Sequence, residues 1–502
     1  MKTNYIITLL LLCCICTKAA PVSTGTVKIR VQSKAFPAQK FMKLKYWTEI
    51  TGFTKREFEP EKKTLTANWE DESFNFEINA DADFFYISLG WEKNEKDPYD
   101  LALTSVYLLM AEKGDDVIIH LDSLSKHSYV DVKGTGSEKF ECLLNLDRSY
   151  RTDYRYWWKN DGLRLGETTL TQTLNKANIL LEFMLEKQFA ILDNYKQTLS
   201  PKLYEQIKLD IVAKGLNQLN YGIYSSVLTR SGAKQLFNPE RVAQSDSIRH
   251  FIKERDKLVK DFSPQSLLRS ALYTEYTLGY VKNHSFLDQK PIEDEILVFA
   301  PHLIDRVLLC YYLNYASNLS VADKDKLFSF GLNVMKEQKY RNLLKVLHER
   351  SSKGAPLPNF RLQDVDGNWV SLEDFRGKVV FVDFWYYGCA GCAGYYRTVL
   401  SEVEKIFEEN DEVVFLTISI DKEEADWKRG VGSGRYTSDK VINLRTENWK
   451  NEPIIKHFGM ISFPYPVLID RNGRLFSNSS NELRHNGING LVSTINRAIT
   501  ME

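Results

Sequence analysis

Two cysteines separated by two residues, Cys389 and Cys392, are the strongest candidates for chemistry in this chain. They follow an apolar run expected to be a buried strand and begin a segment expected to be a helix. The exposed N–H groups and the dipole of a helix N-terminus stabilise a thiolate at the first cysteine. In thiol-disulfide exchange, one thiolate attacks a substrate sulfur and a second thiol resolves the mixed disulfide. We therefore predict that Cys389 is the nucleophile, that Cys392 resolves, and that the two can close a disulfide.

A zinc site and a purely structural disulfide are the two other roles for this pair. Structural zinc takes four ligands, but the other cysteines outside the N-terminal segment, Cys142 and Cys310, are isolated and the eight histidines are scattered. We therefore predict no metal. A structural disulfide remains an alternative, because export alone would oxidise the pair. Cys142 and Cys310 either pair with each other or are buried thiols.

Asp383 lies inside the apolar run, six residues before Cys389. A carboxylate in a buried strand costs free energy unless it has a partner or a function. Burial would raise the pKa of Asp383, so that it could accept a proton from Cys392 during resolution. The alternative is an aspartate on an edge strand that reaches water.

Pro464 lies just before a further apolar strand, in the sequence Ser-Phe-Pro-Tyr-Pro. Because proline cannot donate to a β-ladder, Pro464 marks either a sheet edge or a cis bond in a tight turn. A cis bond would leave the backbone of Phe463 free to pair with an extended substrate segment beside Cys389. We predict that Phe463, Pro464 and Trp385 bind the substrate.

The elements that position these residues belong to an α/β pattern in the last third of the chain, residues 351–502. Strands are expected at 379–384, 413–420 and 467–469, and an amphipathic helix at 398–407. A small, proline-bearing linker at 351–358 precedes this region.

Two further regions precede the linker. Apolar residues alternate with polar ones over about 27–132, which predicts half-buried antiparallel strands and a β-sandwich-like domain at 20–136. The period then lengthens to three or four residues, which predicts an all-α domain at 137–350 with about five to eight helices. The chain of 502 residues is long enough for several such domains. The fold class is therefore multidomain.

Residues 1–19 are predicted to be a signal peptide. Lys2 precedes an apolar run that is too short to span a bilayer, and Thr17 and Ala19 provide small residues for cleavage after Ala19. A buried N-terminal helix is an alternative, as is lipid attachment at Cys14 or Cys16, although the residue before each is larger than usual. We expect export to the periplasm and no transmembrane segment in the mature chain.

The last third resembles the TlpA-like branch of the thioredoxin superfamily. The motifs that carry the resemblance are Gly-Ala-Pro-Leu-Pro-Asn-Phe at 354–360, Asp-Gly at 366–367, Val-Ser-Leu at 370–372, Gly-Lys-Val-Val at 377–380, the cysteine pair, the strand ending at Asp421, Pro464 six residues before Asp470, and Asn-Gly at 472–473. The resemblance implies a thioredoxin fold and an exported thiol-disulfide oxidoreductase. It places Asp383 at the buried acid of the family and Pro464 at its cis-proline. Residues 21–350 resemble the β plus helical leader of some periplasmic relatives.

The chain departs from the family at several positions around the cysteines. Gly388 stands in place of a usual tryptophan, and Ala390 and Gly391 lack the common proline between the cysteines. Arg397 replaces the proline that typically kinks the active-site helix, and Tyr395 takes the position of a usual glutamate. Because a proline would restrain the turn, Gly391 changes the relative stability of the dithiol and the disulfide.

The balance of charged residues limits the classes of partner that we expect. The chain has 66 Lys and Arg against 66 Asp and Glu, so no long-range field attracts nucleic acid, and no nucleic-acid partner is expected. We expect reduction of disulfides in exported proteins, a membrane thiol donor, and no diffusible cofactor, since the cysteines carry the electrons. A disulfide isomerase or oxidase is the alternative within catalysis. From another class, the leader could bind an envelope partner, with the thioredoxin-like domain as an accessory.

Overall fold

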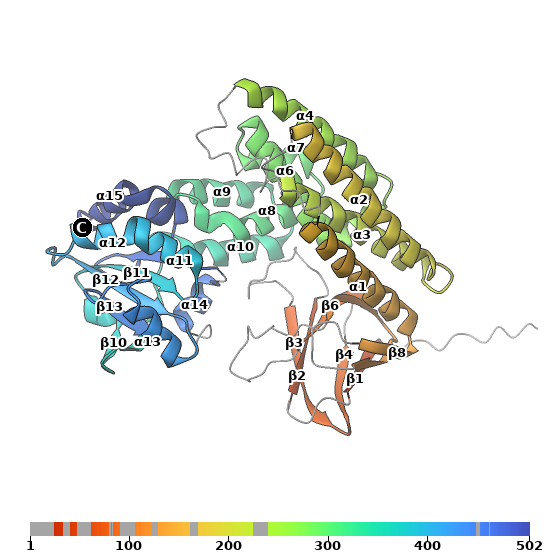
Figure 1. Cartoon of the computed structure of the whole chain (residues 1–502), viewed down its shortest axis with the longest axis horizontal. Helices are drawn as coiled ribbons and strands as arrows, with labels where there is room; N and C mark the ends of the chain where they lie inside the picture. The colour runs from red at the N-terminus through yellow and green to blue at the C-terminus, as the bar shows by residue number, and fades with distance from the viewer. Residues whose placement is uncertain are drawn as a thin grey trace, which may run out of the picture.

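Three regions of different secondary structure follow one another along the chain in a computed structural model (Figure 1). The structure describes residues 25–33, 41–47, 62–79, 82, 84–90, 106–121, 129–160, 169–223, 239–447, 452–460 and 462–501. The predicted signal peptide at 1–19 lies outside the described residues. Among the described helices, none combines the length and the apolar character that a membrane span requires.

The N-terminal region is rich in sheet. Its strands are β1 (Thr26–Ser33), β2 (Phe41–Trp47), β3 (Lys62–Glu70), β4 (Ser73–Asn79), β5 (Phe84–Gly90), β6 (Val106–Glu112), β7 (Asp116–Leu121) and β8 (Tyr129–Thr135). They form one sheet in the order β6-β5-β2-β3-β4-β1-β7-β8, in which β1 and β7 are parallel and the other pairs are antiparallel. The predicted alternation is confirmed, because Val27, Ile29 and Val31 are buried. Apolar side chains from both halves of the sheet share one core.

The middle region is helical. Its elements are α1 (Ser137–Asn160), α2 (Leu170–Asp193), α3 (Pro201–Ile223), α4 (Pro239–Asp256), η4 (Lys257–Val259), α5 (Pro264–Arg269), α6 (Ala271–Asp288), α7 (Ile292–Phe299), α8 (Ile304–Tyr315), η5 (Ala316–Asn318), α9 (Val321–Val334) and α10 (Gln338–Ser351). Ten α-helices among the described residues exceed the five to eight expected. The expectation was too low because short helices such as α5 and α7, with 6 and 8 residues, give little periodic signal.

The C-terminal region is a seven-stranded sheet in the order β10-β9-β13-β12-β11-β14-β15. Its strands are β9 (Arg361–Asp364), β10 (Trp369–Ser371), β11 (Val379–Trp385), β12 (Val413–Ser419), β13 (Ile442–Arg445), β14 (Tyr465–Ile469) and β15 (Leu475–Ser477). Its helices are η6 (Leu372–Phe375), α11 (Ala390–Tyr395), η7 (Tyr396–Leu400), α12 (Ser401–Ile406), α13 (Glu424–Gly432), α14 (Pro453–Phe458), η9 (Asn481–His485) and α15 (Gly487–Ile499). Strands β11, β12 and β13 are parallel, and the other pairings are antiparallel.

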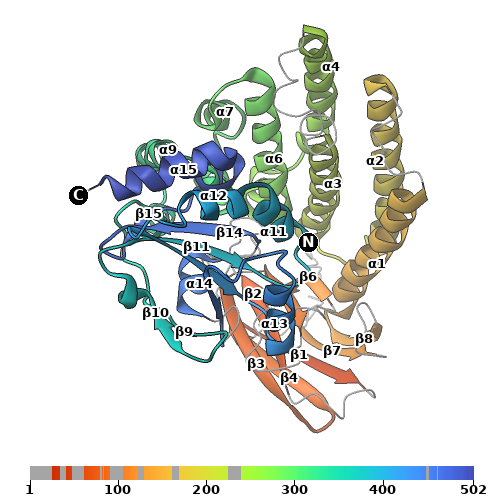
Figure 2. The ribbon, with the colours of Figure 1, turned by 60° about the vertical axis from the view of Figure 1, so that its left-hand side comes forward.

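Helices cover both faces of this sheet, with α11, α12 and α15 on one side and α14 on the other (Figure 2). Successive side chains of β11 point alternately toward the helices on the two faces of the sheet. Val379 and Phe381 pack under α12 and α15, while Val380 and Val382 pack against α14. Asp383 continues the first series, so it faces the layer that contains the cysteine helix.

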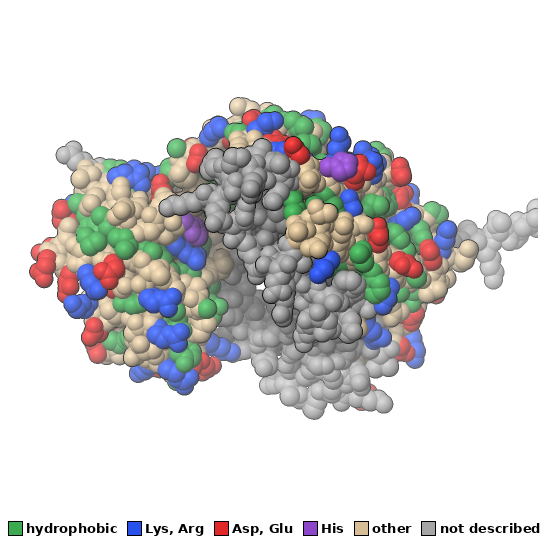
Figure 3. All heavy atoms as spheres, turned by 45° about the horizontal axis from the view of Figure 1, so that its top comes forward, with side chains coloured by type: hydrophobic (Ala, Val, Ile, Leu, Met, Phe, Trp, Pro, Cys, Tyr) green, Lys and Arg blue, Asp and Glu red, His purple; other side chains and the backbone are tan. Residues whose placement is uncertain are grey.

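Hydrogen bonds join the middle and C-terminal regions. Lys324 on α9 donates to the carbonyl of Ser351 at 3.0 Å and to Oδ1 of Asn478 at 2.8 Å. Within the expected linker, Gly354 donates to the Leu475 carbonyl at 2.7 Å, so this segment lies along β15. On the face of the molecule in Figure 3, basic and acidic side chains are intermixed, in keeping with the balanced charge of the sequence.

Candidate active site: a cysteine pair at the start of α11

The cysteine pair lies at the junction between the central strand β11 and helix α11. Gly388 has a φ of 90°, a left-handed conformation that favours glycine and turns the chain into the helix. Cys389 is the N-cap residue of α11, and its Sγ accepts a hydrogen bond from the backbone N–H of Cys392 at 3.0 Å. The two cysteines are joined in a disulfide with Cα atoms 5.3 Å apart. The predicted pair therefore occupies the N-terminal turn of a helix, where backbone donors stabilise a thiolate.

Phe463 and Pro464 lie against this pair. The Phe463–Pro464 peptide bond is cis, one of the two possibilities that the sequence left open. The carbonyl oxygen of Phe463 is 3.7 Å from the Sγ of Cys389. A β-carbon added at Gly391 would lie 3.5 Å from Pro464 Cδ, an ordinary van der Waals contact. The position of Phe463 beside the sulfur is the one predicted from the sequence.

Two exposed tyrosines flank the first cysteine. Tyr386 and Tyr387 keep 39% and 37% of their surface exposed. Tyr386 packs edge-on against Phe463 with ring centroids 5.9 Å apart, and the guanidinium of Arg429 lies 5.4 Å from the centroid of the Tyr387 ring. Cys389 itself is 4% exposed and Cys392 is 1% exposed. Two exposed aromatic side chains therefore precede the pair, in which Cys389 is slightly less buried than Cys392.

The prediction that Trp385 binds the substrate is wrong for its side chain, which is fully buried. Its ring stacks on Tyr436 with centroids 5.0 Å apart and planes 6° from parallel. A β-carbon at Gly430 would lie 2.6 Å from the Trp385 ring, so only glycine lets α13 approach this closely. Trp385 is the last residue of β11, and its side chain packs in the core beside the cysteine pair and Tyr436.

Side chains distant in the sequence hold the loop between β11 and α11. The backbone N–H of Tyr387 donates to both carboxylate oxygens of Asp421, at 2.9 and 3.1 Å. The N–H of Gly388 donates to the hydroxyl of Tyr436 at 3.0 Å. Sequence reasoning noted Asp421 only as a strand end and missed Tyr436, which no local motif marks.

Asp383 is buried in the middle of the sheet, since β11 lies between β12 and β14 and the residue is 1% exposed. The alternative of an edge-strand aspartate that reaches water is therefore excluded. Its Oδ1 has no hydrogen-bond partner in the described structure. Burial raises the pKa of Asp383 well above its usual value, and the charge of Arg484 only partly opposes this.

A second buried acid, Glu404 on α12, was missed. Desolvation raises the pKa of Glu404 to about 7, and its charge in turn raises the pKa of Asp383. Its Oε2 accepts from the hydroxyl of Ser438 at 3.1 Å. Tyr395, at the position of the usual family glutamate, instead donates its hydroxyl to the Leu483 carbonyl at 2.6 Å. An acid on the next helix therefore influences Asp383 in this chain.

The helix that carries the cysteines is not continuous. The sequence predicted one helix over 398–407, but α11 passes through a π-helical turn, η7 (Tyr396–Leu400), before α12. The turn falls at Arg397, where relatives typically have a kinking proline. A π-turn inserts extra backbone into a helix and so redirects its axis without proline.

The part of the chain that contains these features is similar to known thioredoxin-like proteins. Residues 377–475 match a thioredoxin-like family profile. The thiol-disulfide oxidoreductase ResA of Bacillus thuringiensis subsp. konkukian is 28% identical over 134 residues, which cover 27% of this chain and 73% of the relative. ResA of Bacillus anthracis is 24% identical over 147 residues, covering 29% of this chain and 80% of the relative. The solved thioredoxin domain of a thiol-disulfide oxidoreductase from Bacteroides vulgatus is 23% identical and covers 30% of this chain and 99% of that one, with a TM-score of 0.26.

The matched segment contains the whole site. Cys389 and Cys392, the buried Asp383 and the cis Pro464 all fall between residues 377 and 475. The sequence motifs, the helix-capping cysteine and the family match agree with one another. Residues 377–475 of this chain are therefore thioredoxin-like, and the part of the chain that contains the cysteine pair is similar to thiol-disulfide oxidoreductases.

Proposed function

We propose that this protein is an exported thiol-disulfide oxidoreductase that reduces disulfides in periplasmic or envelope proteins. One observation carries the proposal: Cys389, the less buried residue of the pair, caps α11 directly beside the Phe463 carbonyl. This arrangement provides a stabilised thiolate and, next to it, a backbone group with which an extended substrate can pair.

The reaction begins with the reduced pair. The Cys389 thiolate attacks one sulfur of the substrate disulfide, and the other substrate sulfur leaves as a thiolate that takes up a proton. Cys392, once deprotonated, attacks the Cys389 sulfur and releases the second substrate thiol. Two electrons pass from the dithiol to the substrate, and the Cys389–Cys392 disulfide remains. A membrane thiol donor then regenerates the dithiol by the reverse exchange.

Asp383 is proposed to take the proton from Cys392 during resolution. The deprotonated carboxylate is the form that accepts this proton; the raised pKa makes it a stronger base than an ordinary aspartate, and its Oδ1 is free of any hydrogen-bond partner in the described structure. A base with a raised pKa is better matched to a thiol than an ordinary aspartate. Phe463 and Pro464 are proposed to bind the substrate backbone, and no diffusible cofactor is required.

The direction of electron flow is the finer part of the proposal. Reduction rests on the likeness to TlpA-like proteins, and an isomerase or oxidase would use the same two sulfurs. The redox potential of the Cys389/Cys392 couple separates these functions. A strongly negative value supports a reductase, whereas a value near about −120 mV, that of the oxidant DsbA, would overturn it.

Reduction of insulin by residues 20–502 tests the activity. We expect turnover with a thiol donor, loss of turnover in Cys389→Ser, and accumulation of mixed disulfides in Cys392→Ser, because that variant attacks but cannot resolve. Turnover retained in Cys389→Ser would remove the nucleophile assignment.

A second candidate function, binding of a partner by the leader, is favoured by a cavity of about 390 Å³ between α3, α6 and α8. Amide side chains line it, among them Asn217, Asn220 and Asn283. If residues 20–502 exchange no disulfides under any redox condition, this binding function takes precedence over the enzymatic one.

A further inference from the structure

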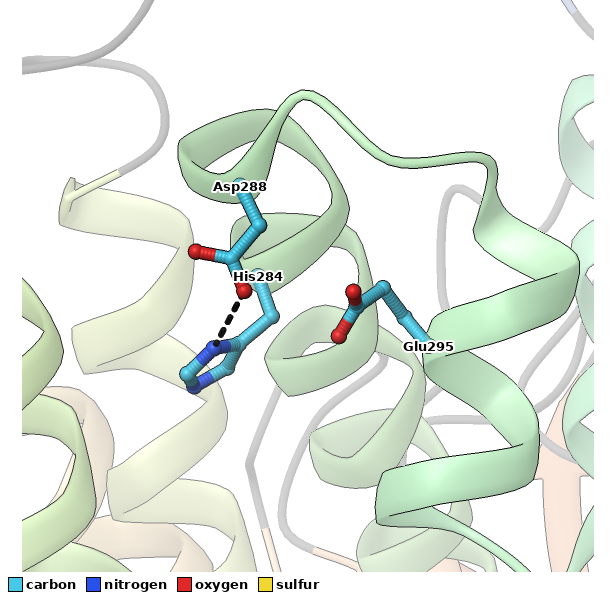
Figure 4. Close-up of side chains that lie close together, drawn as sticks. All are labelled: His284, Asp288 and Glu295. Carbon is cyan, nitrogen blue, oxygen red and sulfur yellow. Dashed lines mark ion pairs between the residues drawn. The ribbon is translucent and has the colours of Figure 1, made fainter.

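Three side chains of the kinds that bind metal ions meet in the helical region, on elements that carry none of the thiol chemistry. His284 and Asp288 lie one turn apart at the end of α6, and Glu295 lies in the first turn of α7. One nitrogen or oxygen from each residue lies within 4.8 Å of the others. In Figure 4 His284 and Asp288 on α6 face each other across an ion pair, and the Glu295 carboxylate extends toward them from α7.

The imidazole of His284 is the most informative member. Its side chain is 8% exposed, and neither ring nitrogen has a hydrogen-bond partner within the described residues. Nδ1 is 3.8 Å from Oδ2 of Asp288, which is too long for a hydrogen bond. The ring is held against Tyr280 and Phe299, with centroids 4.6 and 4.3 Å away. A buried imidazole normally has a hydrogen-bond partner, but within the described residues His284 has only the long ion pair with Asp288, so its nitrogens can accept a further ligand.

The two carboxylates differ in their surroundings. Asp288 accepts a hydrogen bond at Oδ1 from Nε of Arg249 at 2.6 Å, which leaves Oδ2 turned toward His284. Hydrogen bonding of the outer oxygen in this way is typical of the support around a ligating carboxylate. Glu295 is 2% exposed, and its nearest cation, Nζ of Lys290, lies 3.7 Å away on a side chain that is 58% exposed.

Electrostatics favour a cation between the carboxylates. The Glu295 carboxylate is 2% exposed and lies close to that of Asp288, while its ion pair with the exposed Lys290 is long, at 3.7 Å. Bringing the two acids together at this position costs free energy, which the hydrogen bond from Arg249 to Asp288 offsets in part. A divalent ion would offset that cost for both acids and would satisfy one nitrogen of His284.

We propose that His284, Asp288 and Glu295 bind one divalent zinc-class ion that joins the end of α6 to the start of α7. An imidazole in the ligand set selects zinc over calcium or magnesium, which prefer oxygen alone. Tetrahedral zinc with bonds of about 2.0–2.2 Å places its ligand atoms about 3.4 Å apart, so a side-chain movement of about 1 Å closes the site. Three protein ligands leave the fourth position to water.

No metal was predicted from the sequence, because the expected signature of a zinc site was a set of cysteines or paired histidines. A set of one histidine and two carboxylates from two helices has no such signature. The site is independent of the proposed redox function, since none of its residues belongs to the C-terminal domain.

Zinc binding to residues 20–502, without a metal-binding tag, tests the proposal. The Cys389→Ser/Cys392→Ser protein serves as the background, because free thiols would also bind zinc. After treatment with a chelator and dialysis, we expect equilibrium with zinc chloride to leave one zinc per chain by elemental analysis. We also expect the melting midpoint to rise by about 5 °C when zinc exceeds its dissociation constant 100-fold.

Variants assign the ligands. His284→Phe keeps the aromatic packing and Glu295→Gln keeps the shape, and each is expected to lose the zinc and the shift in melting midpoint. His302→Phe is the matched control, since His302 also stacks on a tyrosine but lies outside the cluster, and it is expected to keep both. Should His284→Phe fail to fold, Glu295→Gln and Asp288→Asn decide the question.

Any one of three results would overturn the proposal. The first is no zinc retained by the background protein, which would leave Lys290 and Arg249 as the partners of the two acids. The second is equal zinc in the His302→Phe and Glu295→Gln proteins. Retention of calcium but not zinc would also overturn it, because the imidazole would then have no role.

Discussion

Two buried aspartates, one in each half of the molecule, show how the surroundings decide what an acid does. Asp210 on α3 accepts a hydrogen bond from the Tyr86 hydroxyl at 2.8 Å and others from Ser270 and Gln206. Asp383 on β11 has an oxygen without a hydrogen-bond partner in the described structure. Both are almost fully buried, so burial alone does not distinguish them.

Hydrogen bonds account for the difference. Burial raises the pKa of Asp210 to about 6, because the bonds from Ser270, Tyr86 and Gln206 oppose part of the desolvation. The pKa of Asp383 rises further above its usual value, since only the charge of Arg484 and one backbone bond oppose desolvation. A satisfied carboxylate joins three elements and stabilises the fold, whereas an unsatisfied one remains available to exchange a proton.

The largest expected effect concerns Cys389, the proposed nucleophile in the domain that contains Asp383. Cys389→Ser should lower the rate of insulin reduction at least about 1,000-fold, because a hydroxyl does not exchange with disulfides. Cys142→Ser, in the buried core of the helical region, is the control and should change the rate less than about two-fold. A large loss in the control would show that the two regions are not chemically separate.

The next effect separates the two acids by activity. Asp383→Asn should slow exchange about 100-fold, with accumulation of the mixed disulfide, because the amide cannot accept the proton of Cys392. The wild-type rate should increase as pH rises through the raised pKa of Asp383, and the variant should lose this rise. Stopped-flow rates at several pH values measure both. An equal loss of exchange rate in Asp210→Asn would contradict the proposed difference between the two acids.

The same two variants should reverse their order in stability. Asp210→Asn should lower the free energy of unfolding by about 1–3 kcal/mol at pH 7, because the amide presents N–H groups to hydroxyls that already donate. Asp383→Asn removes an acid with an unsatisfied oxygen and should cost less. Urea midpoints for the two proteins provide the measurement.

The pH dependence of stability gives the sign of the Asp210 contribution. Its folded pKa of about 6 lies above the unfolded value, so the folded state holds the proton longer. The contribution is full below about pH 4 and is lost as pH rises through about 6, a change of about 3 kcal/mol. The deficit of Asp210→Asn relative to wild type should therefore be larger at pH 4 than at pH 7.

The smallest expected effect tests how the charge of Glu404 influences the pKa of Asp383. Glu404→Gln removes a charge that raises the pKa of Asp383, so the rise of rate with pH should move down by less than about one pH unit. Glu402→Gln is the matched control, because Glu402 lies on the same helix but is exposed, and it should leave the profile unchanged. A shift to higher pH in Glu404→Gln would contradict the assigned coupling.

Local pattern was enough for the elements around the site. The continuous apolar run predicted β11, and the cysteine spacing placed both sulfurs on the first turn of α11, since residues three apart on a helix are neighbours. The π-turn at Tyr396–Leu400 was missed because its sequence keeps a helical period. Trp385 was misjudged because its direction depends on how far β11 extends into the core.

The sequence by itself determined where the cysteine pair lies and that an acid precedes it by six residues, since both follow from spacing within one strand and one helix, and it predicted the order of attack. Only the tertiary structure decided which residues support that chemistry. Tyr436 under the loop, Glu404 beside Asp383, and His284 with its two acids meet across distances in sequence that no periodicity spans. The physical reason is that local spacing sets neighbours within a turn, whereas packing of separate elements sets the rest.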